Sequence, residues 1–291
     1  MGPFITTSAG VRIPGVLYGT AWKEGDTARL VRLAVQQGYR GIDTACQPKH
    51  YNEAGVGAGV AACLQSGLTR ADLYLQTKFT SVSGQDPRRI PYDPQAPLRE
   101  QIAQSFAASL VNLQTDYLDG LLLHSPMPTP KQTEQVWRAF ESLVDGGTVR
   151  QIGISNCYSL AQITQLHRDA RIKPSVVQNR FYAKTGYDQE IRDFCAQQQI
   201  VYQSFWTLSA NPHVLAHATI AALALAHRRT APQILFRYLS QNGVVPLTGT
   251  RSETHMRQDL AIFDFELNDK ERGAVDAIFM EKGDNRPRRP D

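Results

Sequence analysis

The sequence contains few cysteines, and they stand far apart. Cys46, Cys63, Cys157 and Cys195 include no C-x-x-C pair, so the sequence predicts neither a disulfide framework nor a zinc site. It also lacks a charged start followed by an apolar core, and no apolar run approaches about 18 residues, which argues against a secretory leader and a membrane-spanning helix. We therefore expect a soluble protein of the reducing cytoplasm, without a metal site.

A strong charge of one sign is missing as well. Lys and Arg total 31 against 27 Asp and Glu, a net charge of +4 that favours an anionic ligand but is too small and scattered to indicate nucleic acid binding. The composition, 42% hydrophobic and 20% charged, is ordinary for a globular protein with a large core. No repeat, low-complexity tract or shift in composition divides the chain, so we expect one domain over residues 1–291.

Short runs of Val, Ile, Leu and Tyr alternate with longer amphipathic stretches. About eight of these runs are typical of strands, and they begin at Val16, Tyr39, Leu73, Leu118, Val149, Ser175, Ile200 and Gly243. The stretches 27–38, 99–114, 133–147 and 159–169 have helical spacing, and several end at glycine. This alternation predicts a parallel sheet. The number of units and the absence of G-x-G-x-x-G favour an α/β fold of the closed (β/α)8 TIM-barrel type.

Two segments fall outside the alternation. Residues 4–14 predict a short N-terminal β-hairpin around Ala9 and Gly10 that closes the bottom of the barrel. The stretch from Thr80 to Leu98, rich in proline and polar residues, predicts one long loop, and such loops are usually functional or mobile.

Reactive side chains gather just past the predicted strands, where a (β/α)8 barrel places its active site. Asp43, Lys78 and His124 end three successive strands. Each alone has a structural explanation, as a helix cap, a surface ion pair or a buried histidine, but the three together indicate a site. Other strand ends carry Trp22, Ser155, Asn156, Gln178, Asn179, Phe205, Trp206 and Thr248.

These side chains suit chemistry on a carbonyl group. A lysine held charged by Asp43 stabilises a nearby phenolate, which lowers the pKa of a tyrosine from about 10 toward the working range. Tyr51, in "KHYNEAGVG", is the candidate general acid. His124 would hydrogen-bond and orient the carbonyl oxygen. A carbonyl polarised in this way accepts hydride.

Several segments, in this order, resemble the aldo-keto reductases over nearly the whole chain. They are "YGTAW", "GYRGIDTA" with "NEAGVG", "LYLQTKF", "DYLDGLLLHSP", "VRQIGISN", "VVQNRFY" and "HMRQDLAIFDFEL". The resemblance implies a (β/α)8 barrel that reduces aldehydes or ketones with NAD(P)H lying across its top. It also implies a catalytic tetrad of Asp43, Tyr51, Lys78 and His124.

The resemblance further implies which residues bind the ligands. Ser155, Asn156 and Gln178 would hold the nicotinamide carboxamide, and Phe205 would stack on its ring. The remaining cofactor contacts would be Gly19, Thr20, Ala21, Leu208, Ala210, Thr248, Gly249, Thr250, Arg251, Ser252, His255 and Asp259. The residues themselves, rather than the resemblance, suggest a largely aromatic substrate pocket lined by Trp22, Tyr92, Met127 and Trp206, with Phe79 beside them.

Two departures from the family pattern matter. Tyr51 follows Asp43 by eight positions instead of five, so His50 competes for the acid position. A neutral imidazole cannot be activated by Lys78 as a phenol can, and we therefore prefer Tyr51. The Lys-Ser that binds the 2′-phosphate of NADPH in many members is missing, and Arg251 would supply that charge. NADPH is the expected cofactor, with NADH left open.

Two other functions remain open. The chain could be a nucleotide-sensing regulatory subunit, since channel β-subunits resemble this family, but no exposed apolar stripe or N-terminal arm indicates a partner surface. A phosphosugar barrel enzyme would use a phosphate site after the last strand but gives Gln178, Phe205 and the tetrad no role. We expect a monomer that binds a small carbonyl compound and neither nucleic acid nor membrane.

Overall fold

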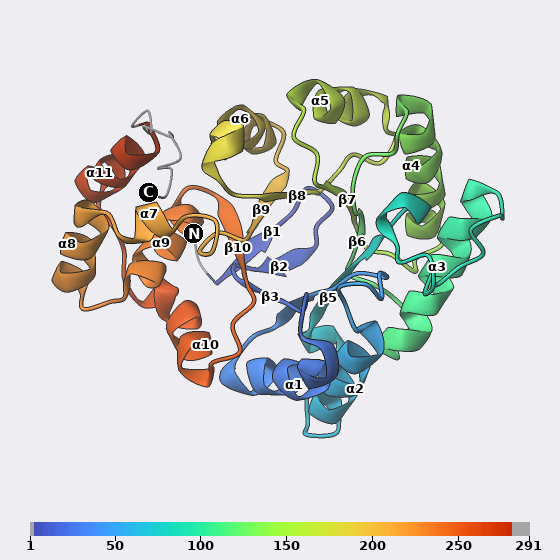
Figure 1. The fold of residues 1–291 in the computed structure, drawn as a ribbon, viewed down its shortest axis with the longest axis horizontal. Coiled ribbons are helices and arrows are strands. Elements are labelled where there is room, and N and C mark those ends of the chain that lie inside the picture. The colour runs from blue at the N-terminus through green and yellow to red at the C-terminus, as the bar shows by residue number, and fades with distance from the viewer. Residues whose placement is uncertain (1–2, 281–291) are drawn as a thin grey trace, which may run out of the picture.

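Eight parallel strands form a closed barrel in the computed structural model, which describes residues 3–280 (Figure 1). The strands are β3 Leu17–Gly19, β4 Gly41–Asp43, β5 Tyr74–Phe79, β6 Gly120–Leu123, β7 Ile152–Ser155, β8 Val176–Arg180, β9 Val201–Phe205 and β10 Val244–Thr248. They pair in sequence order, and β10 pairs with β3 to close the ring. The predicted (β/α)8 barrel is confirmed.

Helices surround the barrel (Figure 1). Their bounds are α1 Thr27–Gln37, α2 Glu53–Leu64, α3 Leu98–Leu113, α4 Pro130–Asp145, α5 Leu160–Asp169, α6 Gln189–Gln197, α7 Pro212–Leu215, α8 Ala218–His227, α9 Ala231–Gln241, α10 Glu253–Leu260 and α11 Asp269–Met280. Helix α1 ends at Gly38, whose φ of 115° lies in the left-handed region that glycine adopts readily. The C-terminal residues 281–291, included in the predicted domain, lie outside the described range.

The predicted N-terminal hairpin closes the bottom of the barrel. Strands β1 Phe4–Thr6 and β2 Arg12–Pro14 pair antiparallel, and Gly10 in the connecting turn has a φ of 75°. Ile13 is fully buried in a separate apolar cluster inside the barrel that also holds Leu17, Tyr74, Leu122, Val176, Val201, Val245 and Leu247. The hairpin therefore seals one end of the barrel and leaves the other end for ligands.

The loop from Thr80 to Leu98 is partly anchored. The only helical segment that the described structure has in this loop before α3 is the short 3-10 stretch Val82–Gly84, but the hydroxyl of Tyr92 donates to the carbonyl of Thr80 at 2.7 Å. The ring of Tyr92 packs 5.7 Å from that of Phe79. The loop is thus held against the carboxyl end of β5.

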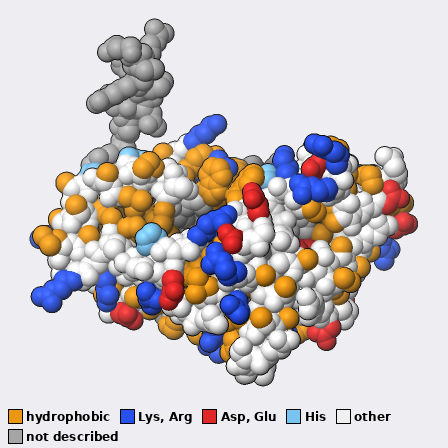
Figure 2. Space-filling view, turned by 60° about the horizontal axis from the view of Figure 1, so that its bottom comes forward, with side chains coloured by type: hydrophobic (Ala, Val, Ile, Leu, Met, Phe, Trp, Pro, Cys, Tyr) orange, Lys and Arg blue, Asp and Glu red, His pale blue; other side chains and the backbone are white. Residues whose placement is uncertain are grey.

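The surface carries charges of both signs. Figure 2 shows acidic side chains lying among basic ones over the face in view, as expected from a net charge of +4. Among residues 3–280, no helix has the length and apolar character needed to cross a bilayer. The four cysteines are buried free thiols.

We expect Ile13→Ala to destabilise the barrel by about 2 to 5 kcal/mol, because it removes a fully buried side chain from the interior cluster. Phe4→Ala on the same hairpin is the control, since Phe4 is 41% exposed. The free energies of unfolding from urea titrations of both variants measure the difference. Equal losses would show that the hairpin does not seal the barrel through Ile13.

Candidate active site

A cavity of about 1290 Å³ opens at the carboxyl ends of the barrel strands. It exceeds the roughly 300–1,000 Å³ of most ligand pockets, so it has room for a ligand larger than a typical small molecule. Its lining includes most of the residues predicted for the site, namely Gly19, Ala21, Trp22, Asp43, Tyr51, His124, Ser155, Asn156, Gln178, Phe205, Trp206, Leu208, Thr248, Gly249, Thr250, Arg251, His255 and Asp259.

Lys78 and Asp43 form a buried ion pair beneath this cavity. The ammonium of Lys78 donates to Oδ2 of Asp43 at 2.6 Å and to the carbonyl of Thr44 at 2.7 Å. Their side chains are 1% and 3% exposed. Burial lowers the pKa of Lys78, and the carboxylate of Asp43 opposes that shift. Because the pair is so deeply buried, loss of either partner would leave an uncompensated charge.

Glutamines fix the other carboxylate oxygen of Asp43. The side-chain amides of Gln76 and Gln178 donate to Oδ1 at 2.7 and 2.9 Å, and both also donate to Oε1 of Gln203 at 2.8 and 2.9 Å. Side chains two apart on a strand point to one face, which is why Gln76 and Lys78 of β5 both reach Asp43. The network holds the carboxylate in one orientation.

The lengthened segment before Tyr51 folds into a turn. The amides of His50 and Tyr51 both donate to the carbonyl of Gln47, at 3.2 and 3.1 Å. This turn brings the Tyr51 ring to the ion pair, with the nitrogen of Lys78 5.3 Å from the ring centroid. The ring of His124 lies edge-on at 5.9 Å.

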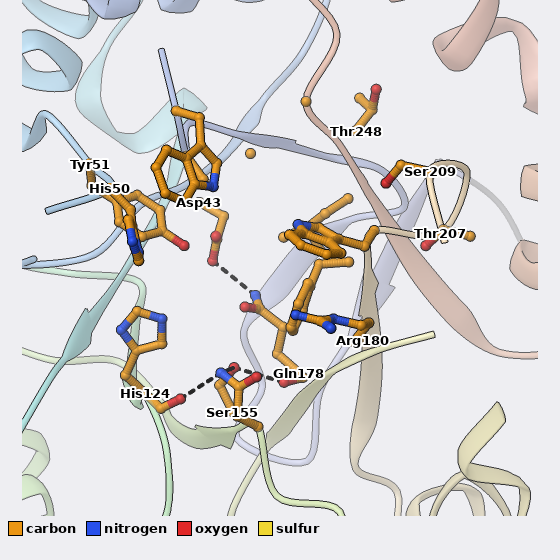
Figure 3. Close-up of a pocket in the computed structure, with 18 of the residues that line it drawn as sticks. Asp43, His50, Tyr51, His124, Ser155, Gln178, Arg180, Thr207, Ser209 and Thr248 are labelled. Atoms are coloured by element: carbon orange, nitrogen blue, oxygen red, sulfur yellow. Dashed lines mark hydrogen bonds between the residues drawn. The ribbon is translucent and has the colours of Figure 1, made fainter. Parts of the chain in front are cut away.

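His50, the competing residue, occupies a different place. Its ring packs on Trp22 with centroids 4.0 Å apart, and the amide of Trp22 donates to its carbonyl at 2.7 Å. Figure 3 shows His50 beside Tyr51 on one side of the cavity. The turn therefore places Tyr51 against Lys78 and His50 against the cavity rim.

The environment of Tyr51 differs from the sequence-based expectation. Tyr51 keeps some surface open to the cavity, but burial and the Asp43 carboxylate raise the pKa of its hydroxyl above the ordinary value. The expectation that Lys78 lowers this pKa is not met here, because burial of the phenol and the charge of Asp43, which pairs with Lys78, raise it. The phenol therefore stays protonated at neutral pH.

His124 is held as a neutral ring. Burial and the charge of Lys78 lower its pKa to about 3. Its Nδ1 lies 2.7 Å from the hydroxyl of Thr80, and its carbonyl accepts from the side-chain amide of Asn156 at 2.8 Å. A neutral imidazole fixed at Nδ1 keeps Nε2 for a ligand.

The residues predicted to hold a carboxamide lie beside the predicted tetrad, with Asn156 contacting His124 and Gln178 contacting Asp43. Ser155 donates to the carbonyl of Gln178 at 2.8 Å, and Asn156 adopts a left-handed φ of 52°, which Asn tolerates better than most residues. Phe205 ends β9 and is partly exposed to the cavity. These groups offer hydroxyl and amide partners and an aromatic face, as a planar ring bearing an amide requires.

Basic residues occupy another end of the cavity. Arg251 donates to Oδ2 of Asp26 at 2.8 Å and to the carbonyl of Trp22 at 2.7 Å, and Lys23 donates to the carbonyl of Gly249. The segments after β3 and β10 are thereby linked. Burial and the charge of Arg251 lower the pKa of Lys23 to about 8. Two cations in one wall favour an anionic ligand.

Some predicted ligand residues lie outside the cavity lining. Tyr92 is buried against Phe79, and Met127 packs partly buried against the large hydrophobic core. Thr20 is fully buried and donates to the carbonyl of Asp43. Ala210 and Ser252 also lie outside, and Ser252 caps α10. Aromatic residues near a barrel end pack as readily as they bind, which explains Tyr92.

Several residues near the site were missed by the sequence analysis, and five of them make contacts that matter for the site. These five are Lys23, Gln76, Thr80, Arg180 and Gln203. Gln76 and Gln203 each precede a predicted site residue by two on a strand, and that spacing marks the same face. Lys23 directly follows Trp22, and Arg180 follows Gln178 by two, so proximity along the chain was the available signal for both.

The family model for the Aldo/keto reductase family matches residues 16–279. The chain belongs to this family. Glyoxal reductase of Bacillus subtilis is 33% identical to this aldo-keto reductase over 248 residues, covering 85% of this chain and 82% of that protein. Family membership supports an oxidoreductase that acts on carbonyl compounds.

Solved structures agree with the fold. An aldo/keto reductase from Brucella melitensis gives a TM-score of 0.82 at 28% identity, covering 96% of this chain and 100% of that one. The Bombyx mori aldo-keto reductase in complex with NADP gives 0.81 at 27% identity, covering 95% and 92%. The likeness extends over nearly the full length of this aldo-keto reductase.

We expect the ring of His124 to stay neutral from pH 8 down to about 5, because burial and Lys78 lower its pKa to about 3. The unfolded chain takes up that proton near pH 6.5, so this group lowers the free energy of unfolding as pH falls from 6.5 toward 3, by at most about 1.4 kcal/mol per pH unit. An NMR titration measures the pKa of the His124 ring, and comparison with His124→Gln assigns its signal. A midpoint near 6.5 would contradict the assignment.

Proposed function

We propose that this aldo-keto reductase reduces aldehydes or ketones to alcohols with a nicotinamide cofactor, and that Tyr51 is the proton donor. The observation that carries the proposal is the convergence of Tyr51, the Lys78–Asp43 ion pair and neutral His124 at one point of the cavity. These residues come from different segments of the chain, and none of the contacts is local in sequence.

The cavity suits a dinucleotide. Its volume of about 1290 Å³ accommodates both a cofactor and a small substrate. Ser155, Asn156 and Gln178 are the residues we assign to the carboxamide, Phe205 to the nicotinamide ring, and Lys23 and Arg251 to the phosphates. A bound reduced nicotinamide would supply the hydride that this chain's own side chains cannot provide.

Tyr51 and His124 would share the carbonyl oxygen. With the hydroxyl of Thr80 as donor to Nδ1 of His124, Nε2 carries the proton and hydrogen-bonds the oxygen. The Tyr51 hydroxyl donates to the same oxygen and transfers its proton as the oxygen gains charge. This arrangement requires a protonated phenol and a neutral imidazole, and the directions of both pKa shifts agree with it.

The ion pair acts after the proton leaves. Transfer turns Tyr51 into a phenolate, a charge that burial and Asp43 disfavour. Lys78, 5.3 Å from the ring centroid, offsets part of that cost, and the glutamine network keeps Lys78 and Asp43 in place. We assign Lys78 the stabilisation of the phenolate and Asp43 the positioning of Lys78.

We propose NADPH as the preferred cofactor. The proposal rests on Arg251 at the cavity wall, because a guanidinium binds a phosphate through charge-assisted hydrogen bonds. The Bombyx mori relative in complex with NADP supports the same choice. In this structure the guanidinium is held by Asp26, so binding of the 2′-phosphate competes with that ion pair.

Tyr51→Phe tests the proton donor. We expect it to retain cofactor binding and to lose about 100- to 10,000-fold in kcat for aldehyde reduction, because general acid catalysis contributes on that scale. His50→Ala is the matched control, since its ring stacks on Trp22 at the rim, and it should lose far less. Steady-state rates with NADPH and an aldehyde panel measure both.

Near-normal turnover by Tyr51→Phe would refute the acid assignment. If the wild-type protein binds NADPH but turns over no aldehyde, ketone or diketone with either cofactor, the regulatory-subunit alternative gains support instead.

Arg251→Ala tests cofactor choice. Loss of one charge-assisted hydrogen bond should weaken NADPH binding by about 1.5 to 3 kcal/mol and NADH binding much less. Fluorescence titration of wild type and variant with both cofactors decides it. Arg29→Ala removes another cation that binds Asp26 and serves as control. An equal loss of affinity for NADPH and NADH in Arg251→Ala would mean that Arg251 does not bind the 2′-phosphate.

A further inference from the structure

Arg180 is a cavity cation that the proposed carbonyl chemistry leaves unused. It ends β8, two residues after Gln178, and lines the cavity. Its guanidinium carbon lies 4.0 Å from the ring centroid of Trp206 and 5.3 Å from that of Tyr182. Its backbone amide donates to the hydroxyl of Tyr158 at 3.1 Å. A strand and two aromatic faces therefore hold this charge in place.

No acidic partner neutralises Arg180 within residues 3–280. Its Nε is buried without a hydrogen-bond partner, and no described carboxylate lies within 4.0 Å of the guanidinium, in contrast to Arg251 with Asp26. The two carboxylates that line the cavity are already engaged, Asp43 by Lys78 and Asp259 by Thr248 at 2.7 Å. A partly buried cation without a counter-charge favours an anion from outside.

The position of Arg180 separates it from the basic residues assigned to the phosphates. Arg180 pairs in register with Phe205, the residue assigned to the nicotinamide ring, whereas Lys23 and Arg251 follow β3 and β10. Figure 3 shows Arg180 across the cavity from Tyr51 and His124. Its charge thus faces the part of the cavity where the carbonyl group would react.

We infer that Arg180 binds a carboxylate carried by the substrate, so that the substrate class is aldehydes or ketones bearing a carboxylic acid group. The inference rests on the proposed function. A guanidinium presents parallel N–H donors that match a carboxylate bidentately, and among residues 3–280 no group accepts a hydrogen bond from the guanidinium of Arg180.

The carboxylate is unchanged in the reaction. Hydride adds to the carbonyl carbon, the π electron pair moves to the oxygen, and that oxygen takes the proton of Tyr51. The reduced nicotinamide of the proposed function is the reductant, and the product is the corresponding hydroxy acid. Arg180 fixes the end of the substrate that does not react, which positions the carbonyl at Tyr51.

Matched substrates test the inference. We would compare 4-carboxybenzaldehyde with its methyl ester, methyl 4-formylbenzoate, in wild type, Arg180→Met and Lys184→Met. Lys184 is an exposed cation on the next segment and does not line the cavity. We expect Arg180→Met to lose about 10- to 100-fold in kcat/KM on the acid, mainly through KM, and less than about threefold on the ester. Lys184→Met should match wild type.

A binding measurement separates this inference from the proposed function. Benzoate titrated calorimetrically into the cofactor-free protein should bind wild type at least tenfold more tightly than Arg180→Met, whether or not either turns over an aldehyde. Arg180→Lys, which keeps the charge but loses the planar fork, should fall between them. Thermal melts of the variants show that each is folded.

Two results would overturn the inference. Equal loss on acid and ester, together with weaker NADPH binding, would assign Arg180 to the cofactor. Equal benzoate affinity in wild type and Arg180→Met would show that Arg180 holds no carboxylate. Failure of wild type to reduce any carbonyl compound would count against the proposed function alone, because the benzoate titration still decides the role of Arg180.

Discussion

The buried contact between Lys78 and Asp43 is the interaction on which the rest of the site depends. An ammonium and a carboxylate at 2.6 Å, both almost fully buried, are stable only if the remaining hydrogen-bonding capacity of each is satisfied. The carbonyl of Thr44 and the amides of Gln76 and Gln178 do this. A polar layer therefore crosses the barrel interior directly below the cavity.

That layer divides the barrel into two halves with different tasks. Below it, an apolar cluster with Ile13 of the hairpin fills the interior and stabilises the fold. Above it, side chains such as Tyr51 and His124 face the cavity. The division allows the reactive end to carry charged and polar groups without weakening the apolar interior that closes the other end.

Much of this arrangement could be predicted from the sequence, because alternation of short apolar runs and amphipathic stretches fixes a parallel barrel and strand ends meet at one face. The proposed tetrad was predicted from strand ends and from the family resemblance, and the structure brings its four residues together. The raised pKa of Tyr51 could not be predicted from the sequence, because it depends on burial of the ring and on the Asp43 carboxylate, which already neutralises Lys78. Tyr92 was misplaced for a similar reason, since its position inside the long loop gives no sign that it packs on Phe79.

The links between the segments after β3 and β10 have a kinetic consequence. Arg251 holds Asp26 and the carbonyl of Trp22, and Lys23 holds the carbonyl of Gly249. A phosphate bound to Arg251 in place of Asp26 would first have to break the Arg251–Asp26 ion pair, so the proposed phosphate binding would include a local opening step. The Arg251–Asp26 pair is about half exposed, and exposed pairs are weakened by salt. Added salt therefore weakens the Arg251–Asp26 pair, which favours opening, and also weakens the attraction between a phosphate and the cations. Because the two effects oppose each other, the association rate of a phosphate ligand does not have to fall steadily as the salt concentration rises.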